Sequence, residues 1–134
     1  MFGLQIKYLS FFFGLISILS FFNIIYSYYF NLYLNLDTYY LSLFLSSILA
    51  ILFYILKISP KKTSIFQKIL TVFLGYILLP LVLSIPFYLS IYNLTLINSF
   101  FESVSGFTST GFTIFENIKN IDQSLILWRS TIQW

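Results

Sequence analysis

The sequence contains no cysteine and no histidine, and only 8% of its 134 residues are charged. The first two absences exclude disulfides, thiolate nucleophiles, imidazole bases and the commonest metal ligands. Only four carboxylates remain for acid–base chemistry, namely Asp37, Glu102, Glu116 and Asp122. We therefore expect a protein that is not an enzyme and that carries no cofactor.

Charge is scarce compared with soluble domains, in which about a quarter of the residues are charged. Hydrophobic residues make up 59% of the chain, and residues 8–36, 38–56 and 69–101 carry no charge. A helix needs about 20 residues to cross a hydrocarbon core of about 30 Å. The uncharged stretches therefore predict membrane-spanning helices. The net charge of +3 comes from lysines beside these stretches, so we expect contact with lipid and none with nucleic acid.

Two of these helices form the first part of the chain. We predict spans over residues 8–30 and 39–56, joined by a turn that holds Asp37 and no basic residue. A segment broken by a proline follows, and four of the seven basic residues share it: Lys57, Lys61, Lys62 and Lys68. Basic residues favour the cytoplasmic side of a membrane. Lys7 and the lysine-rich segment are therefore expected in the cytoplasm, and the turn outside.

The second part of the chain begins with a third expected span over residues 69–88. The next apolar segment, 94–107, is only about half a membrane thickness long before it meets Gly111, which predicts a re-entrant helix. A further apolar helix begins near Ser124 and is incomplete at Trp134.

These elements predict an all-α membrane protein with two parts. Residues 1–62 form an N-terminal transmembrane hairpin with its cytoplasmic lysine-rich segment. Residues 63–134 form a unit of helix, re-entrant pore loop and helix, in which the last helix is truncated.

The segment after residue 107 carries the chemistry of an ion pathway. A short helix that ends inside the membrane directs the partial negative charge of its last carbonyls towards the bilayer centre, which favours a cation there. The residues that follow supply hydroxyls and successive backbone carbonyls: Thr108, Ser109, Thr110, Gly111, Phe112 and Thr113. Rings of such carbonyls replace the water shell of potassium in selectivity filters. By composition alone, the same residues also fit a helix crossing or a turn.

Three ordered motifs carry a resemblance to a known family. They are Pro86-Phe87, then Phe101-Glu-Ser-Val-Ser-Gly-Phe-Thr-Ser-Thr-Gly-Phe-Thr113, then Leu127-Trp-Arg-Ser-Thr-Ile-Gln-Trp134. In type, order and spacing they resemble the first pore repeat of bacterial Trk/Ktr-type potassium uptake proteins. The preceding hairpin is similar to the extra two-helix unit of the Trk branch.

The resemblance implies potassium uptake by a pore of four tandem helix, pore-loop, helix repeats in the bacterial inner membrane. It implies that backbone oxygens of Thr110 and Gly111 bind K⁺, with Thr108, Ser109, Phe112 and Thr113 around them. It further implies a homodimer of the complete protein and a cytosolic nucleotide-binding regulatory subunit. One repeat supplies one quarter of a filter, so the chain is expected to be an N-terminal fragment that works with the remaining repeats.

Two other functions stay open at this stage. A self-sufficient channel could form if four copies of the third span, the pore loop and the last helix assembled around one pore. A small membrane scaffold that transports nothing would make the Gly-Thr loop incidental. The truncated last span argues against the first of these alternatives.

The isolated charges near the predicted pore loop allow two interpretations. Ser99 and Glu102 have the spacing of a capping box, in which the carboxylate returns to the start of the helix. Alternatively, Glu102 forms a buried ion pair with Arg129, because a lone charge near hydrocarbon is costly. Asn23, in the middle of the first span, is expected to make an interhelical hydrogen bond.

Tyrosines cluster near the outer turn and predict an aromatic belt at the membrane surface. The residues concerned are Tyr26, Tyr28, Tyr29, Tyr33, Tyr39 and Tyr40.

Overall fold

The computed structural model describes residues 6–56 and 64–133 of the chain. Within these ranges the regular elements are helices, and no strand is present. Their bounds are α1 Ile6–Tyr29, α2 Leu36–Ile55, α3 Ile65–Leu83, α4 Ile85–Tyr88, α5 Leu96–Phe107, the 3₁₀ turn η1 Ile118–Asn120 and α6 Gln123–Ile132. The all-helical fold class is confirmed.

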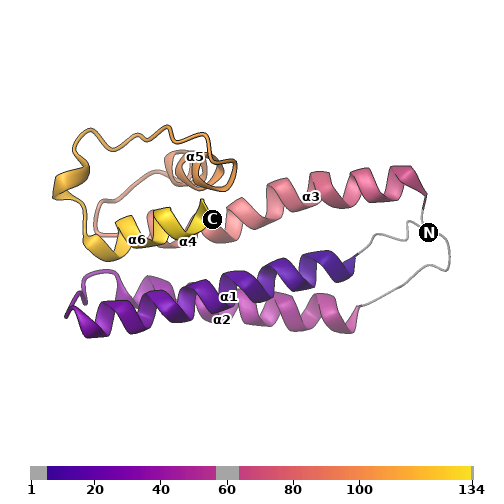
Figure 1. Ribbon diagram of the computed structural model, residues 1–134, viewed down its shortest axis with the longest axis horizontal. Coiled ribbons are helices and arrows are strands. Elements are labelled where there is room, and N and C mark those ends of the chain that lie inside the picture. The colour runs from indigo at the N-terminus through magenta and orange to yellow at the C-terminus, as the bar shows by residue number, and fades with distance from the viewer. Residues whose placement is uncertain (1–5, 57–63, 134) are drawn as a thin grey trace.

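Three of the helical stretches are long and apolar enough to cross a membrane: Lys7–Tyr29, Leu36–Ile55 and Ile65–Tyr88. They run alongside one another, with the start of α1 and the start of α3 at the same end of the bundle (Figure 1). Three residues of the lysine-rich segment, Lys57, Lys61 and Lys62, lie outside the described residues. The orientation of the bundle in the membrane stays a prediction.

The third span begins at Ile65, a few residues earlier than its hydropathy indicates. Ser64 caps it, because its hydroxyl accepts from the Phe66 N–H at 3.1 Å and the Gln67 side chain accepts from the Ser64 N–H at 3.1 Å. This capping box pairs backbone N–H groups at the start of the helix, and so the helix begins before the apolar stretch does. Near the other end the helix breaks between α3 and α4 at Ser84, next to Pro86.

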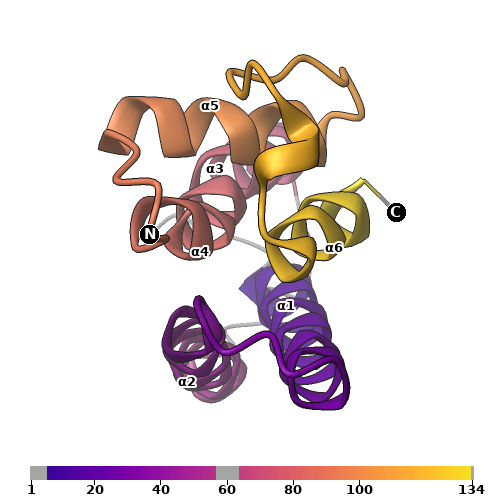
Figure 2. The same cartoon turned by 90° about the vertical axis from the view of Figure 1, so that its left-hand side faces the viewer.

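A row of serine hydroxyls joins α1 to α2, and we call it the serine seam. Ser10 donates to the carbonyl of Ala50 at 2.8 Å, the hydroxyls of Ser17 and Ser47 lie 2.7 Å apart, and Ser20 donates to Ser42 at 3.2 Å. Small hydroxyl side chains let two helices approach closely in lipid and add hydrogen bonds across the contact. The two helices lie side by side along most of their length in both ribbon views (Figures 1 and 2).

The core of the described structure lies where the hairpin meets α6 and the end of α3. Trp128 on α6 is fully buried, and its indole N–H donates to the carbonyl of Leu83 at 3.2 Å. The Tyr39 ring on α2 packs against it, with 6.0 Å between ring centroids. The aromatic-belt prediction is therefore wrong for Tyr39, which is fully buried because its hydroxyl has a partner on α6, 2.9 Å away at Ser124.

Asn23 is also buried, but the predicted interhelical hydrogen bond is absent. Neither side-chain polar atom of Asn23 has a hydrogen-bond partner in the described part of the chain. The Ser27 hydroxyl, one turn further along α1, has none there either.

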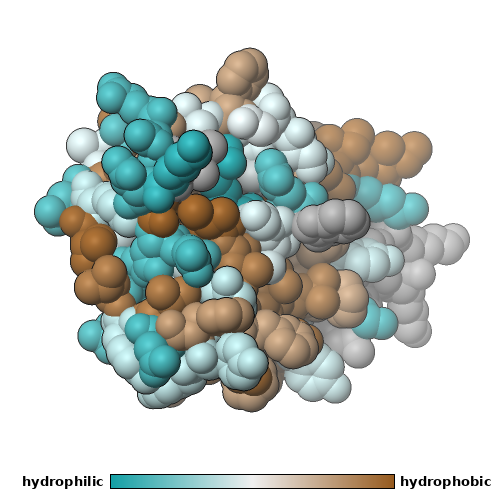
Figure 3. All heavy atoms as spheres, turned by 60° about the vertical axis from the view of Figure 1, so that its left-hand side comes forward, coloured by the Kyte–Doolittle hydropathy of each residue, from teal (hydrophilic) through white to brown (hydrophobic). Residues whose placement is uncertain are grey.

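Helix α5 lies across the bundle rather than along it. Figure 2, which looks down the bundle, shows α5 from the side while α1, α2 and α6 are seen end-on. On the face shown in Figure 3, hydrophilic residues gather over the loop that follows α5, whereas hydrophobic residues continue towards the far end. Large apolar side chains on the helices are exposed, for example Phe44, Ile55 and Phe73, as expected for surfaces that meet lipid or other membrane helices.

Candidate functional site

The candidate site is built on α5 and the loop that follows it. Thr95 caps the helix, since its hydroxyl accepts from the Asn98 N–H at 3.3 Å. Ser99 and Glu102 consequently lie inside the helix, and the capping-box interpretation of these two residues is wrong. The helix has 12 residues, a length of about 18 Å, which is close to half of a membrane.

The Glu102 carboxylate is fully buried beneath the loop and has three partners. The guanidinium Nε of Arg129 on α6 donates to its Oε2 at 2.9 Å. The hydroxyl of Thr113 and the backbone N–H of Ile114 each donate to its Oε1 at 2.6 Å. The structure thus brings together Glu102 and Arg129, the two charges that sequence analysis set side by side. A buried carboxylate needs this number of partners to offset the loss of its water shell.

Arg129 also holds the loop through backbone carbonyls. Its Nη2 donates to the carbonyl of Phe112 at 2.9 Å and lies 3.4 Å from the carbonyl of Gly111. The Ser105 hydroxyl donates to the same Phe112 carbonyl at 2.6 Å. Three of the six predicted filter residues are therefore bound by this ion pair: the carbonyls of Gly111 and Phe112 accept from Arg129, and the hydroxyl of Thr113 donates to Glu102.

Five of the six predicted filter residues, Thr108 to Phe112, are exposed on the surface of the chain, and Thr113 is half-buried. Two of them adopt the left-handed region of backbone space, Ser109 with φ 54° and Gly111 with φ 82°. The carbonyls of Ser109 and Thr110 accept no hydrogen bond from the residues that the structure describes. Unpaired carbonyls in a strained, exposed loop can act as ligands for a cation without losing an existing bond.

The loop packs tightly against α6. A Cβ added at Gly106 would lie 3.1 Å from Cγ2 of Ile132, a tight contact that the Ile132 side chain would have to relieve by shifting. The Ser109 hydroxyl donates to the carbonyl of Gln133 at 3.2 Å, just after α6 ends. Within the described ranges no three carboxylates come together. The oxygens that could contact a cation at this loop are therefore carbonyls and hydroxyls.

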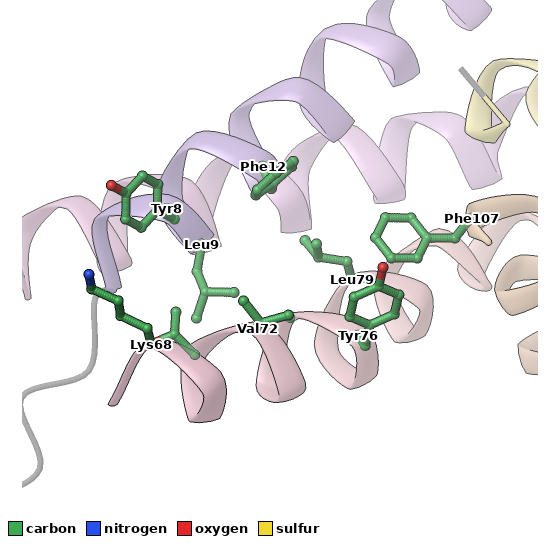
Figure 4. Close-up of a pocket in the computed structure, with 10 residues that line it drawn as sticks. Tyr8, Leu9, Phe12, Lys68, Val72, Tyr76, Leu79 and Phe107 are labelled. Carbon is green, nitrogen blue, oxygen red and sulfur yellow. The ribbon is translucent and has the colours of Figure 1, made fainter. Parts of the chain in front are cut away.

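A separate groove runs between α1 and α3, away from the loop carbonyls. It has a volume of about 600 Å³ and is mostly apolar, with Lys68 at one end and Phe107 at the other (Figure 4). A second cavity of about 360 Å³ shares Phe12, Leu79 and Phe107 with it and reaches Gln133. Apolar walls and a lysine do not suit a cation, so this groove is not the ion site.

Sequence analysis missed a second polar cluster, at the end of the bundle that holds the α1–α2 turn. There the side chain of Asn35 donates to the carboxylate of Asp122 at 2.8 Å, and both residues are buried. The two residues are 87 positions apart, so no local pattern relates them. The one available signal is chemical, because both are polar residues at helix starts in a chain with few such groups.

Parts of the chain are similar to known proteins. The chain resembles cation transporters in 75 residues that are 31% identical to an uncharacterized cation transporter of Methanocaldococcus jannaschii, covering 56% of this chain and 16% of the relative. No protein family profile and no solved structure matches the chain.

A second relative gives a narrower likeness. Over 56 residues the chain is 46% identical to the Trk system potassium uptake protein TrkI of Halomonas elongata, covering 42% of this chain and 10% of the relative. The resemblance to Trk-type transporters that the motifs carry is therefore confirmed over part of the chain. The matched segments span less than a fifth of either relative.

Proposed function

We propose that this chain contributes one filter loop, residues 108–113, to a four-repeat pore that takes up potassium across the bacterial inner membrane. The observation that carries the proposal is the loop itself. It follows a helix of half-membrane length, has two exposed residues, Ser109 and Thr110, whose carbonyls accept no hydrogen bond from the described residues, and is held from behind by the pair of Glu102 and Arg129. The likeness to a potassium uptake protein agrees with this chemistry.

The electrostatics of the loop favour a monovalent cation. The last carbonyls of α5 bring about half a negative charge to the start of the loop. The carboxylate of Glu102 and the guanidinium of Arg129 form a pair, so they add little net charge nearby. A pathway that relies on carbonyl dipoles suits potassium, because each oxygen replaces one water of its hydration shell.

The remainder of the pore comes from elsewhere in this proposal. A single loop leaves the exposed carbonyls on one side of an ion, whereas a filter surrounds it. The groove between α1 and α3, together with the second cavity that reaches Gln133, offers an apolar surface for another membrane helix of the same transporter. The complete transporter is a homodimer that works with a cytosolic nucleotide-binding subunit and itself carries no cofactor and no enzymatic activity.

Protection of the loop by potassium tests the proposal. Thr110→Cys places a thiol on the loop of this cysteine-free chain, and Glu116→Cys, on the exposed segment beyond it, is the matched control. In the transporter that contains this chain, potassium should slow modification of position 110 by a small thiol reagent severalfold, and sodium should not. The cysteine at position 116 should be modified at the same rate in potassium and in sodium. Equal rates at position 110 with and without potassium would refute the filter assignment.

A further inference from the structure

Asn35 stands at the start of α2 but does not cap it. Asparagine at this position commonly accepts a hydrogen bond from a backbone N–H in the first turn. Here its side chain makes no such bond, and its main-chain carbonyl instead accepts from the N–H and the hydroxyl of Thr38, at 3.1 and 2.7 Å. The carboxamide, which is 1% exposed, is therefore available for other partners.

Both ends of this carboxamide are bonded to remote parts of the chain. Its Nδ2 donates to Oδ2 of Asp122 at 2.8 Å, and its Oδ1 accepts from the backbone N–H of Ile91 at 3.2 Å. One side chain thus joins the α1–α2 turn, the segment after α4 and the start of α6. Removing it would leave a buried carboxylate and a backbone N–H each short of a partner, which is costly in a low-dielectric setting.

Asp122 in turn fixes the first turn of α6. Its Oδ1 accepts from the Ser124 N–H at 3.2 Å, its Oδ2 accepts from the Ser124 hydroxyl at 2.8 Å, and its own N–H donates to the Tyr92 hydroxyl at 2.6 Å. The Tyr39 hydroxyl of α2 meets the Ser124 hydroxyl at 2.9 Å. We call this cluster the hairpin junction: Asn35, Tyr39, Ile91, Tyr92, Asp122 and Ser124.

The hairpin junction holds the start of α6, the helix that also carries Arg129. Arg129 follows Asp122 by seven residues, which is about two turns of α6. Its bonds to Glu102 and to the carbonyl of Phe112 are both 2.9 Å long. Hydrogen bonds weaken steeply outside a narrow range of distance and angle. A shift of α6 by one residue moves the Arg129 backbone about 1.5 Å along the helix axis, a displacement that lengthens both bonds unless the side chain changes its conformation.

We propose that Asn35 is a positioning residue through which the N-terminal hairpin sets the place of α6 and, through Arg129, the place of the filter loop. The hairpin then helps to position the filter loop and is more than an added membrane anchor. The link from Asn35 to α6 stands by itself, and only the last link, from α6 to ion binding, rests on the proposed function.

The first experiment measures the link from the hairpin to the rest of the chain, without any transport. Spin labels on cysteines introduced at the exposed positions Tyr29 and Glu116 report the distance between the hairpin and the segment that leads to α6, in the transporter that contains this chain. Asn35→Ala and Asn35→Asp should each broaden or shift the distance distribution. Asn120→Ala, which removes an exposed asparagine side chain, should leave it unchanged.

An exchange of the two junction residues makes this test specific. In Asn35→Asp with Asp122→Asn, residue 35 still accepts from the Ile91 N–H, and the donor and acceptor of the bond between residues 35 and 122 change places. The Ser124 hydroxyl then accepts from the new Nδ2 of residue 122 and donates to the Tyr39 hydroxyl. The double variant should restore the narrow distribution that each single change disturbs. Failure of the exchange to improve on the single variants would overturn the proposal, as would a native distribution for Asn35→Ala.

The second experiment measures potassium uptake by the same transporter at equal amounts in the membrane. Asn35→Ala should raise the potassium concentration for half-maximal uptake about tenfold, and the exchange variant should restore it. Gly111→Ala serves as a direct disturbance of the loop. If Gly111→Ala raises that concentration but Asn35→Ala does not, the hairpin does not position the filter and the proposal fails. If neither does, the filter assignment fails, while the distance measurements still decide the link to α6.

Discussion

Gly111 offers the sharpest test of the filter loop, because the chain contains a matched glycine. A Cβ added at Gly111 or at Gly14 meets no atom within 4 Å, so neither change introduces a clash. The two positions differ in their backbone. Gly111 has φ 82°, whereas Gly14 lies in the interior of α1. A residue with a Cβ resists the left-handed conformation by about 1–2 kcal/mol, while alanine stabilises a helix interior relative to glycine by about 0.5–1 kcal/mol.

Gly111→Ala should therefore destabilise the native conformation of the loop, whereas Gly14→Ala should slightly stabilise α1 and leave the loop as it is. In the transporter that contains this chain, Gly111→Ala should lower the equilibrium constant between native and non-native conformations of the loop by a factor of roughly 5–30, since about 1.4 kcal/mol corresponds to a factor of ten. The measurements are half-saturation for potassium and the preference for potassium over sodium, at matched expression. Both should deteriorate in Gly111→Ala and stay native in Gly14→Ala.

D-alanine at position 111 shows whether L-alanine acts through backbone strain at positive φ or through the loss of the flexibility of glycine. A D-residue adopts positive φ without strain, so semisynthesis with D-alanine should keep uptake near the native level where L-alanine reduces it. Unchanged affinity and unchanged ion preference with L-alanine would show that the loop around Gly111 is a structural turn, and the reasoning would be refuted.

Three further predictions concern the ion pair, the orientation and the need for other repeats. Glu102→Gln or Arg129→Met alone should destabilise the transporter by about 3 kcal/mol or more, because each single change leaves one charge of the pair without its counter-charge. The double variant should lose less stability than the sum of the two single variants. Additive losses of thermal stability in detergent would contradict this. In intact cells an impermeant thiol reagent should label a cysteine at Tyr33 but not one at Lys68, since the end with Lys68 is expected in the cytoplasm; the reverse pattern would invert the topology. Residues 1–134 alone should not restore growth of a potassium-uptake-deficient strain at low potassium, and robust growth would favour a homotetramer instead.

The sequence predicts the helices well because their signal is local. An uncharged stretch of membrane length has one stable conformation in lipid, so α1, α2 and α3 follow from hydropathy alone. Their ends are less predictable, since a cap is set by one or two side-chain bonds. Near α5 both Thr95 and Ser99 are suitable caps by type, and the structure uses Thr95.

The candidate site is predictable in part for a related reason. Glu102 and Arg129 are isolated charges in an apolar chain, so the cost of burying each one alone points to the other. The role of Asn35 has no such signal, because a polar residue in a turn is expected to meet water. Its burial depends on its bond to Asp122, and four helices, α2 to α5, separate the two residues in the sequence.

The serine seam has a consequence for the order in which the protein is made. All of its donors and acceptors lie between Ser10 and Ala50, so the first two helices contain everything needed for their own pairing. Chains are synthesised from the N-terminus, and units that can form early generally do. The hairpin can therefore assemble in the bilayer while the ribosome is still making α3. It would then present Asn35 as a fixed docking point for the later helices, so that biogenesis proceeds from a finished template rather than by simultaneous packing of all helices.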